Sequence, residues 1–165
     1  MTITGIDFDG VLRRISNFGD YINSDKGFSD PYISGDSCLA AFAHTMVADI
    51  NAMGDSNITR GISLPSHRID KLVRGETSEA AWKDLTNHYL LRRIHYKRTL
   101  IETKRGYLGL ATDLLDEGDL VCVIGGAQVP LISRDRTGDT CRFVGECYVH
   151  GIMDGEAVQD PEEFQ

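Results

Sequence analysis

The sequence predicts an α+β fold in which N-terminal helices pack on a small C-terminal antiparallel β-barrel-like module. Apolar residues recur at helical spacing in the first half, whereas short segments rich in β-branched residues follow one another in the second half. The 165 residues are enough for a single domain, 1–165. We divide it into an irregular segment (1–36), a helical half (37–96) and a β module (97–158).

The helical half begins with an amphipathic pattern after Ser37. Apolar residues at steps of three and four form one stripe: Leu39, Phe42, Met46, Ile50 and Met53. Asp36 or Ser37 can cap the start of this helix, and Gly54 can end it. A short helix is expected at 67–73, and a longer, well-buried helix is expected from 77 or 78 to about 96.

The β module contains five short segments bounded by turn residues: RTLIET, GYLGLA, DLVCVIG, QVPLIS and CRFVGECYVHG. Strands this short, in unbroken succession, predict an antiparallel meander that closes into a small barrel. Residues 1–36 are rich in Gly, Asp, Asn and Ser. They predict loop structure with one short strand or helix near 11–15.

Charge and composition exclude several classes of function. A net charge of −8 argues against broad binding of nucleic acid or of an anionic membrane. No apolar stretch approaches the roughly 18 residues of a spanning helix, so no membrane insertion is expected. We see no signal peptide, and the four cysteines form no CxxC pair. These observations predict free thiols and a cytoplasmic location.

Residues 5–12, GIDFDGVL, are similar to the nucleophile loop of haloacid-dehalogenase-type phosphatases. Such an enzyme needs a parallel sheet with alternating strands and helices, together with a downstream Lys and an acidic pair. The antiparallel character of the second half opposes this assignment. We therefore interpret Asp7 and Asp9 as residues of a solvated turn.

Three segments of the second half resemble the C-terminal region of fungal heterokaryon-incompatibility (HET domain) proteins: RGYLGLA (105–111), GDLVCVIGGAQVPLISR (118–134) and FVGECYVHGIMDGEAV (143–158). AFAHTMVAD (41–49) is similar to a helix found upstream of that region in the family. The motifs of the family's N-terminal effector domain do not occur here. The resemblance therefore implies a fungal source and a fold, but it does not carry over the family's cell-death signalling.

Strand parity sorts the residues of 141–150 into two faces. Cys141, Phe143, Gly145, Cys147 and Val149 form one face, which we interpret as core. The other face carries Glu146, Tyr148 and His150 in one row, each about 7 Å from the next. Cys147 and His150 fall on opposite faces, so a Cys/His dyad is not expected. The polar row has a simpler alternative, because one face of such a strand is commonly solvated.

Two classes of function remain. We prefer a cofactor-independent cyclase or isomerase of fungal specialised metabolism, concretely a Diels–Alder-type pericyclase that binds a small apolar terpenoid or polyketide intermediate. In this hypothesis the catalytic residues are Glu146, Tyr148 and His150. The substrate-binding residues are Tyr96, Tyr107, Arg142 and Val144. No metal or cofactor is expected. The alternative is a non-catalytic recognition or regulatory binding module, and a remnant without activity is a third reading.

Overall fold

The computed structural model describes residues 5–15, 31–51, 59–60, 94–137 and 140–158. The chain divides into two compact units. The first combines residues 1–16 with residues 97–165, and the second consists of residues 17–96.

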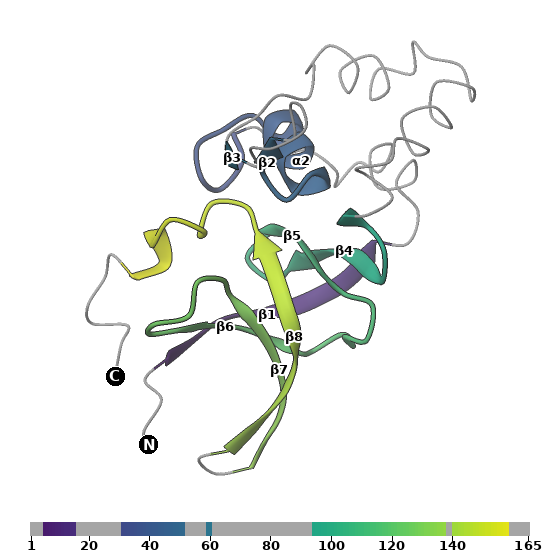
Figure 1. The fold of residues 1–165 in the computed structure, drawn as a ribbon, viewed down its shortest axis with the longest axis vertical. Coiled ribbons are helices and arrows are strands. Elements are labelled where there is room, and N and C mark those ends of the chain that lie inside the picture. The colour runs from purple at the N-terminus through teal and green to yellow at the C-terminus, as the bar shows by residue number, and fades with distance from the viewer. Residues whose placement is uncertain (1–4, 16–30, 52–58, 61–93, 138–139, 159–165) are drawn as a thin grey trace. The chain divides into compact units, whose positions relative to one another are not determined.

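Six strands of the first unit form a closed antiparallel barrel (Figure 1). The strands are β1 (Gly5–Ile15), β4 (Arg98–Thr103), β5 (Leu108–Thr112), β6 (Leu120–Ile124), β7 (Leu131–Thr137) and β8 (Thr140–Val149). Their order around the barrel is β1-β4-β5-β8-β7-β6. A short 3-10 helix, η1 (Glu156–Val158), follows β8. The five predicted C-terminal strands and the small barrel are confirmed.

The barrel is not the simple meander that the sequence predicted. β5 and β6 follow one another in sequence but do not pair. After β5 the chain crosses the barrel to β6, which pairs with β1. The meander β6-β7-β8 then returns to β5, where Leu110 pairs with Tyr148. Residues 113–119, which we call the crossover, therefore connect β5 and β6, two strands that are not adjacent in the barrel.

β1 forms where the sequence predicted irregular structure with at most one short element near 11–15. Two bulges explain the difference. Pairing with β6 shifts between Asp7 and Asp9, and pairing with β4 shifts between Val11 and Arg13. Each bulge adds one residue and disrupts the period-2 alternation that identifies a strand. The partner strands are also remote in sequence, so no local turn marks the pairing.

The core of the barrel includes side chains from the strands and from two connecting segments. Its buried members are Val11, Ile101, Ala111, Leu115, Val121, Ile132, Cys147, Val149, Ile152 and Ala157. Leu115 comes from the crossover, whereas Ile152 and Ala157 come from the segment after β8. Apolar burial is the main favourable term in folding, so these segments contribute to stability as well as connecting strands.

β5 needs a glycine at position 109, where it packs against β8. A Cβ at Gly109 would lie 2.7 Å from the backbone oxygen of Tyr148 and 3.0 Å from a side-chain carbon of Ile101. Backbone cannot move away as a flexible side chain can. The absence of a side chain at Gly109 therefore permits the observed packing of β5 on β8.

The second unit contains the helix α2 (Cys38–Met46). The Oγ of Ser37 accepts the N–H of Ala40 at 3.1 Å, which confirms the predicted N-cap. The helix ends earlier than predicted because Ala48 and Asp49 adopt left-handed conformations, with φ of 49° and 53°. The expected stop at Gly54 lies outside the described residues. Strands β2 (Ile50–Asn51) and β3 (Thr59–Arg60) then form a separate two-stranded sheet.

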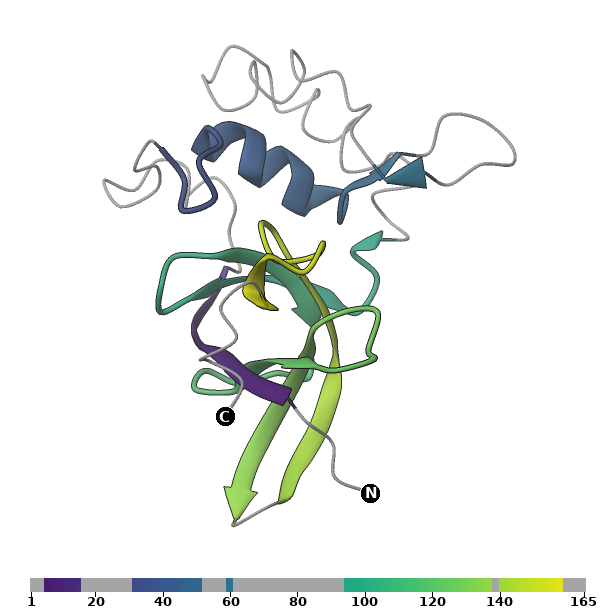
Figure 2. The same ribbon diagram turned by 90° about the vertical axis from the view of Figure 1, so that its left-hand side faces the viewer.

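The predicted α+β class, with helices packed on a barrel, is wrong. Within the described residues the fold is mostly β, and α2, with 9 residues, is the one complete α-helix (Figure 2). Residues 50–51 and 59–60 form strands inside the predicted helical half. The helices expected at 67–73 and along most of 77–96 lie outside the described residues. No helix among the described residues is long and apolar enough to cross a membrane.

Candidate functional site

β8 carries most of the residues that the sequence proposed as a site, and its two halves behave differently. In the C-terminal half, Cys147 and Val149 lie in the barrel core, as strand parity predicts. In the N-terminal half, Cys141 and Phe143 are exposed rather than buried, so the prediction for these two residues is wrong.

A bulge between the two halves of β8 accounts for this failure. Ile132 pairs with Gly145, but the next residue of β7, Ser133, pairs with Phe143. Val144 is therefore the extra residue of β8. Its half-buried side chain packs against the core. One additional residue is sufficient to change which side chains point inward.

The predicted catalytic row is only partly assembled. Tyr148 and His150 are both buried, and the Tyr148 hydroxyl lies 3.0 Å from His150 Nδ1, within hydrogen-bond distance. The N–H of His150 donates to the Leu108 oxygen at 2.9 Å, which fixes the position of the pair beside β5. Glu146, the third member, is exposed. The structure thus brings two of the three proposed catalytic residues together.

The proposed substrate-binding residues differ in burial and in the unit to which they belong. Tyr107 is half-buried against the barrel core, and its N–H donates to Thr103 Oγ1 at 3.0 Å. Val144 also packs on the core, whereas Arg142 is exposed. Tyr96 is 72% exposed and belongs to the unit of residues 17–96. The roles proposed for these residues stay predictions.

A polar arrangement that the sequence analysis missed is centred on Arg134. Its guanidinium donates to both oxygens of Asp119, at 2.7 Å each, and its Nη1 lies 2.7 Å from Asp116 Oδ2. Its Nη2 also donates to the Leu114 oxygen at 2.9 Å. We call this arrangement the Arg134 clamp. It joins β7 to the crossover, and a single sequence gives no sign of such pairing because the residues come from separate turns and strands.

The charge and the burial of Asp119 indicate that the Arg134 clamp has a structural role rather than a catalytic one. Asp119 is only 3% exposed. Burial by itself would raise its pKa, but the hydrogen bonds from the Arg134 guanidinium and the Asp116 N–H, with the charge of the arginine, hold the pKa of Asp119 below its ordinary value. The aspartate is therefore ionised at neutral pH. Its bonding to Arg134 and Asp116 leaves it poorly suited to proton transfer.

The Asp-x-Asp-Gly stretch has a structural role that differs from the predicted solvated turn. Asp9 is half-buried within β1. Its Oδ1 accepts the N–H of Gly10 at 2.8 Å, and its Oδ2 accepts the N–H of Arg105 at 2.9 Å. The carboxylate therefore joins β1 to the turn after β4. This role explains Asp9 without any phosphatase chemistry.

The buried thiols are poor nucleophiles. Burial raises the pKa of Cys147 far above its ordinary range and also raises the pKa of Cys122. Cys122 Sγ lies 3.0 Å from Ser133 Oγ. Because Cys147 points into the core, the interpretation of this residue as a small buried hydrophobe is confirmed. Among the described residues, no group of three or more His, Cys, Asp or Glu is arranged to hold a metal ion.

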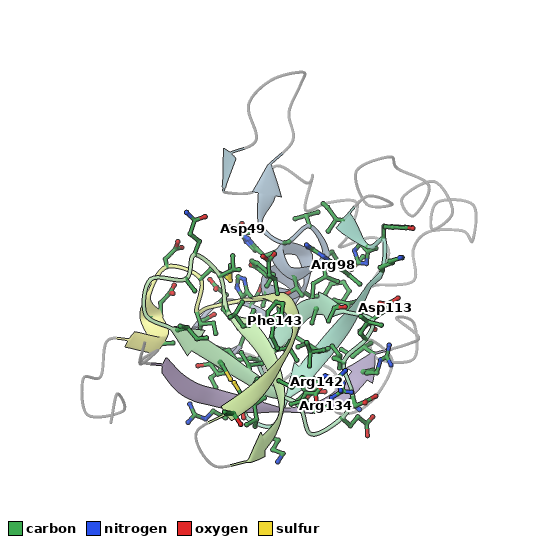
Figure 3. The ribbon with its side chains drawn as sticks, turned by 60° about the horizontal axis from the view of Figure 1, so that its bottom comes forward. Asp49, Arg98, Asp113, Arg134, Arg142 and Phe143 are labelled. Carbon is green, nitrogen blue, oxygen red and sulfur yellow. The ribbon has the colours of Figure 1, made fainter. Side chains whose placement is uncertain are left out.

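Exposed apolar and cationic side chains occur where the β7–β8 hairpin leaves the barrel. Phe143 is 61% exposed and Arg142 beside it is exposed as well. Figure 3 shows Arg142 next to Arg134, its partner on β7, and Phe143 further along β8. Leu114, 70% exposed, lies on the crossover to which Arg134 bonds. Aromatic and arginine side chains of this kind are enriched at protein-binding surfaces.

Residues 70–164 match the Het-6 beta-barrel domain, a span of more than half the chain that contains β4 to β8. Among curated proteins, the chain is similar to heterokaryon incompatibility protein 6, OR allele, of Neurospora crassa. The two are 40% identical over 96 residues, which cover 56% of this chain and 14% of that protein. No solved structure matches the chain. The resemblance predicted from the sequence is thus confirmed, and the chain belongs to the Het-6 beta-barrel domain family.

Proposed function

We propose that the chain is a non-catalytic recognition or regulatory module that binds a partner protein through its barrel. The observation that carries the proposal is the exposed pair of Arg142 and Phe143 on the β7–β8 hairpin, because arginine and aromatic side chains are frequent anchors of protein interfaces. The Arg134 clamp adds support, since it holds the crossover and the hairpin together before any partner binds.

The similarity to heterokaryon incompatibility protein 6 agrees with a regulatory role. The name assigns that protein to heterokaryon incompatibility, but the aligned region spans only 14% of its length. We therefore propose only the binding role of this region, in the cytoplasm of a fungal cell. The four free cysteines are compatible with that compartment.

A Diels–Alder-type pericyclase of secondary metabolite biosynthesis is the second candidate, and one observation favours it. The buried Tyr148 hydroxyl and His150 ring lie 3.0 Å apart, and such a pair could polarise a carbonyl group of a small apolar substrate. Glu146 would have to join them from an exposed position. This candidate has weaker support than the binding module, because the comparisons point to incompatibility proteins rather than to enzymes of metabolism.

One experiment separates the two candidates. The purified 165-residue chain is immobilised and incubated with a Neurospora crassa lysate, and captured proteins are identified by mass spectrometry and then purified for affinity measurement. We expect a partner that binds the wild-type chain and is lost with Val11→Asp, which places a carboxylate at a core position that is 1% exposed.

The same chain is incubated in parallel with an organic extract of the fungus, and compounds are followed by chromatography with mass detection. A change in retention at constant mass indicates isomerisation. If a compound is converted and Tyr148→Phe, His150→Ala or Glu146→Gln slows its conversion, the enzyme replaces the binding module as the function. If the chain neither captures a partner nor converts a compound, the proposed binding function is wrong for these conditions.

A further inference from the structure

β8 is longer than β5, the strand that pairs with it on one side. β7 pairs with β8 from Thr140 to Glu146, but β5 pairs with β8 only from Cys147 to Val149. Both ribbon views show the β7–β8 hairpin extending past the other strands (Figures 1 and 2). In the described part of the chain, no strand pairs with residues 141–144 on the side that faces away from β7. We call these four residues the β8 edge.

The edge has a defined end at the barrel. A Cβ at Gly145 would lie 2.7 Å from the Cγ2 of Thr112, so the threonine is packed directly against β8 at that position. Because β5 pairs with β8 as far as Cys147 and Thr112 packs on Gly145, an added strand would lie beside residues 141–144. The backbone N–H and C=O groups of such an edge are a template for one more strand.

The two central side chains of the edge differ in chemistry. Phe143 lies opposite Ser133 and Arg142 lies opposite Arg134, so the two residues belong to successive positions of the pleat. Arg13 donates to the Glu102 carboxylate, Arg14 donates to the backbone oxygen of Asp113, and Arg134 is held in its clamp. Among the described residues, by contrast, no hydrogen bond or ion pair is made by the Arg142 side chain. The edge thus offers an exposed aromatic ring on one face and an exposed cation on the other.

We propose that the β8 edge binds an extended peptide segment of a partner protein, which adds a strand to the hairpin and alternates acidic with apolar residues. A carboxylate on one face of the added strand pairs with Arg142, and an apolar side chain on the other face packs on Phe143. This inference rests on the proposed binding function, for which it names the site and the chemistry of the partner.

A second copy of the chain fits the edge less well. Two identical antiparallel edges related by a two-fold axis pair residues whose numbers have the same parity. Within the edge, Arg142 would then face Arg142 or Val144 of the other copy, and neither supplies a carboxylate. Both copies would also carry a net charge of −8. An acidic strand from another protein can pair with Arg142, whereas a second copy of the chain supplies no carboxylate at that position.

The test starts from a phage-displayed library of random peptides selected on the full chain. The strongest peptide is synthesised, and its affinity is measured by fluorescence anisotropy. We expect selected peptides with acidic and apolar residues in alternation, and binding at least about tenfold weaker with Arg142→Glu or with Phe143→Ser. Replacing the acidic residues of the peptide by lysine should restore its binding to Arg142→Glu. Arg105→Glu, an exposed cation on the turn after β4, is the matched control and should leave affinity unchanged.

Backbone methylation tests whether the peptide adds a strand. Two versions of the peptide carry N-methyl groups on alternate amides, in the two possible sets, and only one set should abolish binding because only one row of amides faces β8. Equal binding of both versions, or peptides unaffected by the variants at 142 and 143, would overturn the edge inference while leaving a binding module in place. Recovery of no peptide above the unselected library also overturns it, as does a dimer that Phe143→Ser dissociates.

Discussion

The Arg134 clamp provides the sharpest prediction of stability. Asp119→Asn keeps the shape of the side chain but removes its charge, and an amide oxygen cannot replace two carboxylate oxygens that accept from both Arg134 and Asp116. Charge-assisted hydrogen bonds contribute about 1.5–3 kcal/mol, and loss of a buried partner costs roughly 3–5 kcal/mol. Arg134 keeps its contacts to Asp116 and Leu114, so we expect a loss near the low end, about 2–3 kcal/mol.

The assay is unfolding by urea and by heat, followed by far-UV circular dichroism at pH 7. For a chain of this size the expected loss lowers Tm by roughly 4–12 °C. Glu102→Gln is the matched control, because it neutralises the acid of the Arg13–Glu102 pair, whose arginine is more exposed than Arg134. That change should cost only about 0.5–1 kcal/mol. The reasoning is refuted if Asp119→Asn is no more destabilising than Glu102→Gln.

The same clamp predicts a dependence on pH. Because the pKa of Asp119 is lowered in the folded protein, its stabilisation is fully present above the ordinary aspartate pKa of about 3.9. The stabilisation is lost as the pH falls through the lower folded pKa. The difference in unfolding free energy between wild type and Asp119→Asn should therefore be constant from pH 5 to 7 and shrink below about pH 4. A difference that stays unchanged at lower pH would show that Asp119 does not have a lowered pKa.

Three further predictions test the barrel. Gly109→Ala should lower the free energy of unfolding by about 1–3 kcal/mol, because the added Cβ meets the backbone oxygen of Tyr148. Gly10→Ala is the control and should lower it by less than about 1 kcal/mol, because its Cβ meets only the flexible end of Lys104. Equal losses in urea unfolding would contradict the packing at Gly109. Val11→Ala should cost about 2 kcal/mol in the same assay if β1 contributes to the core, and a loss below about 0.5 kcal/mol would place β1 outside it. In native protein iodoacetamide should label Cys141 first among the four cysteines, as read by peptide mass spectrometry, and early labelling of Cys147 would contradict its burial.

The sequence was informative where structure depends on neighbouring residues. The five C-terminal strands were predicted because each is a short β-branched run between turn residues. Ser37 was identified as a cap because its side chain acts on an amide three residues away. The inward direction of Cys147 and Val149 followed from alternation alone.

Features that depend on remote partners or on one added residue could not be predicted. Bulges interrupt the alternation of β1, and its partners β4 and β6 lie far along the chain. The bulge at Val144 similarly exposes Phe143, which alternation places in the core. The crossover and the Arg134 clamp arise from the strand order of the closed barrel, and no local pattern determines that order.

Hydrogen–deuterium exchange of the full chain, alone and with its purified captured partner, tests the central claim that the barrel acts by binding. The account predicts that the partner slows exchange of amides within residues 97–158, most strongly in peptides that contain the β8 edge. Protection confined to residues 17–96 would contradict a binding role for the barrel.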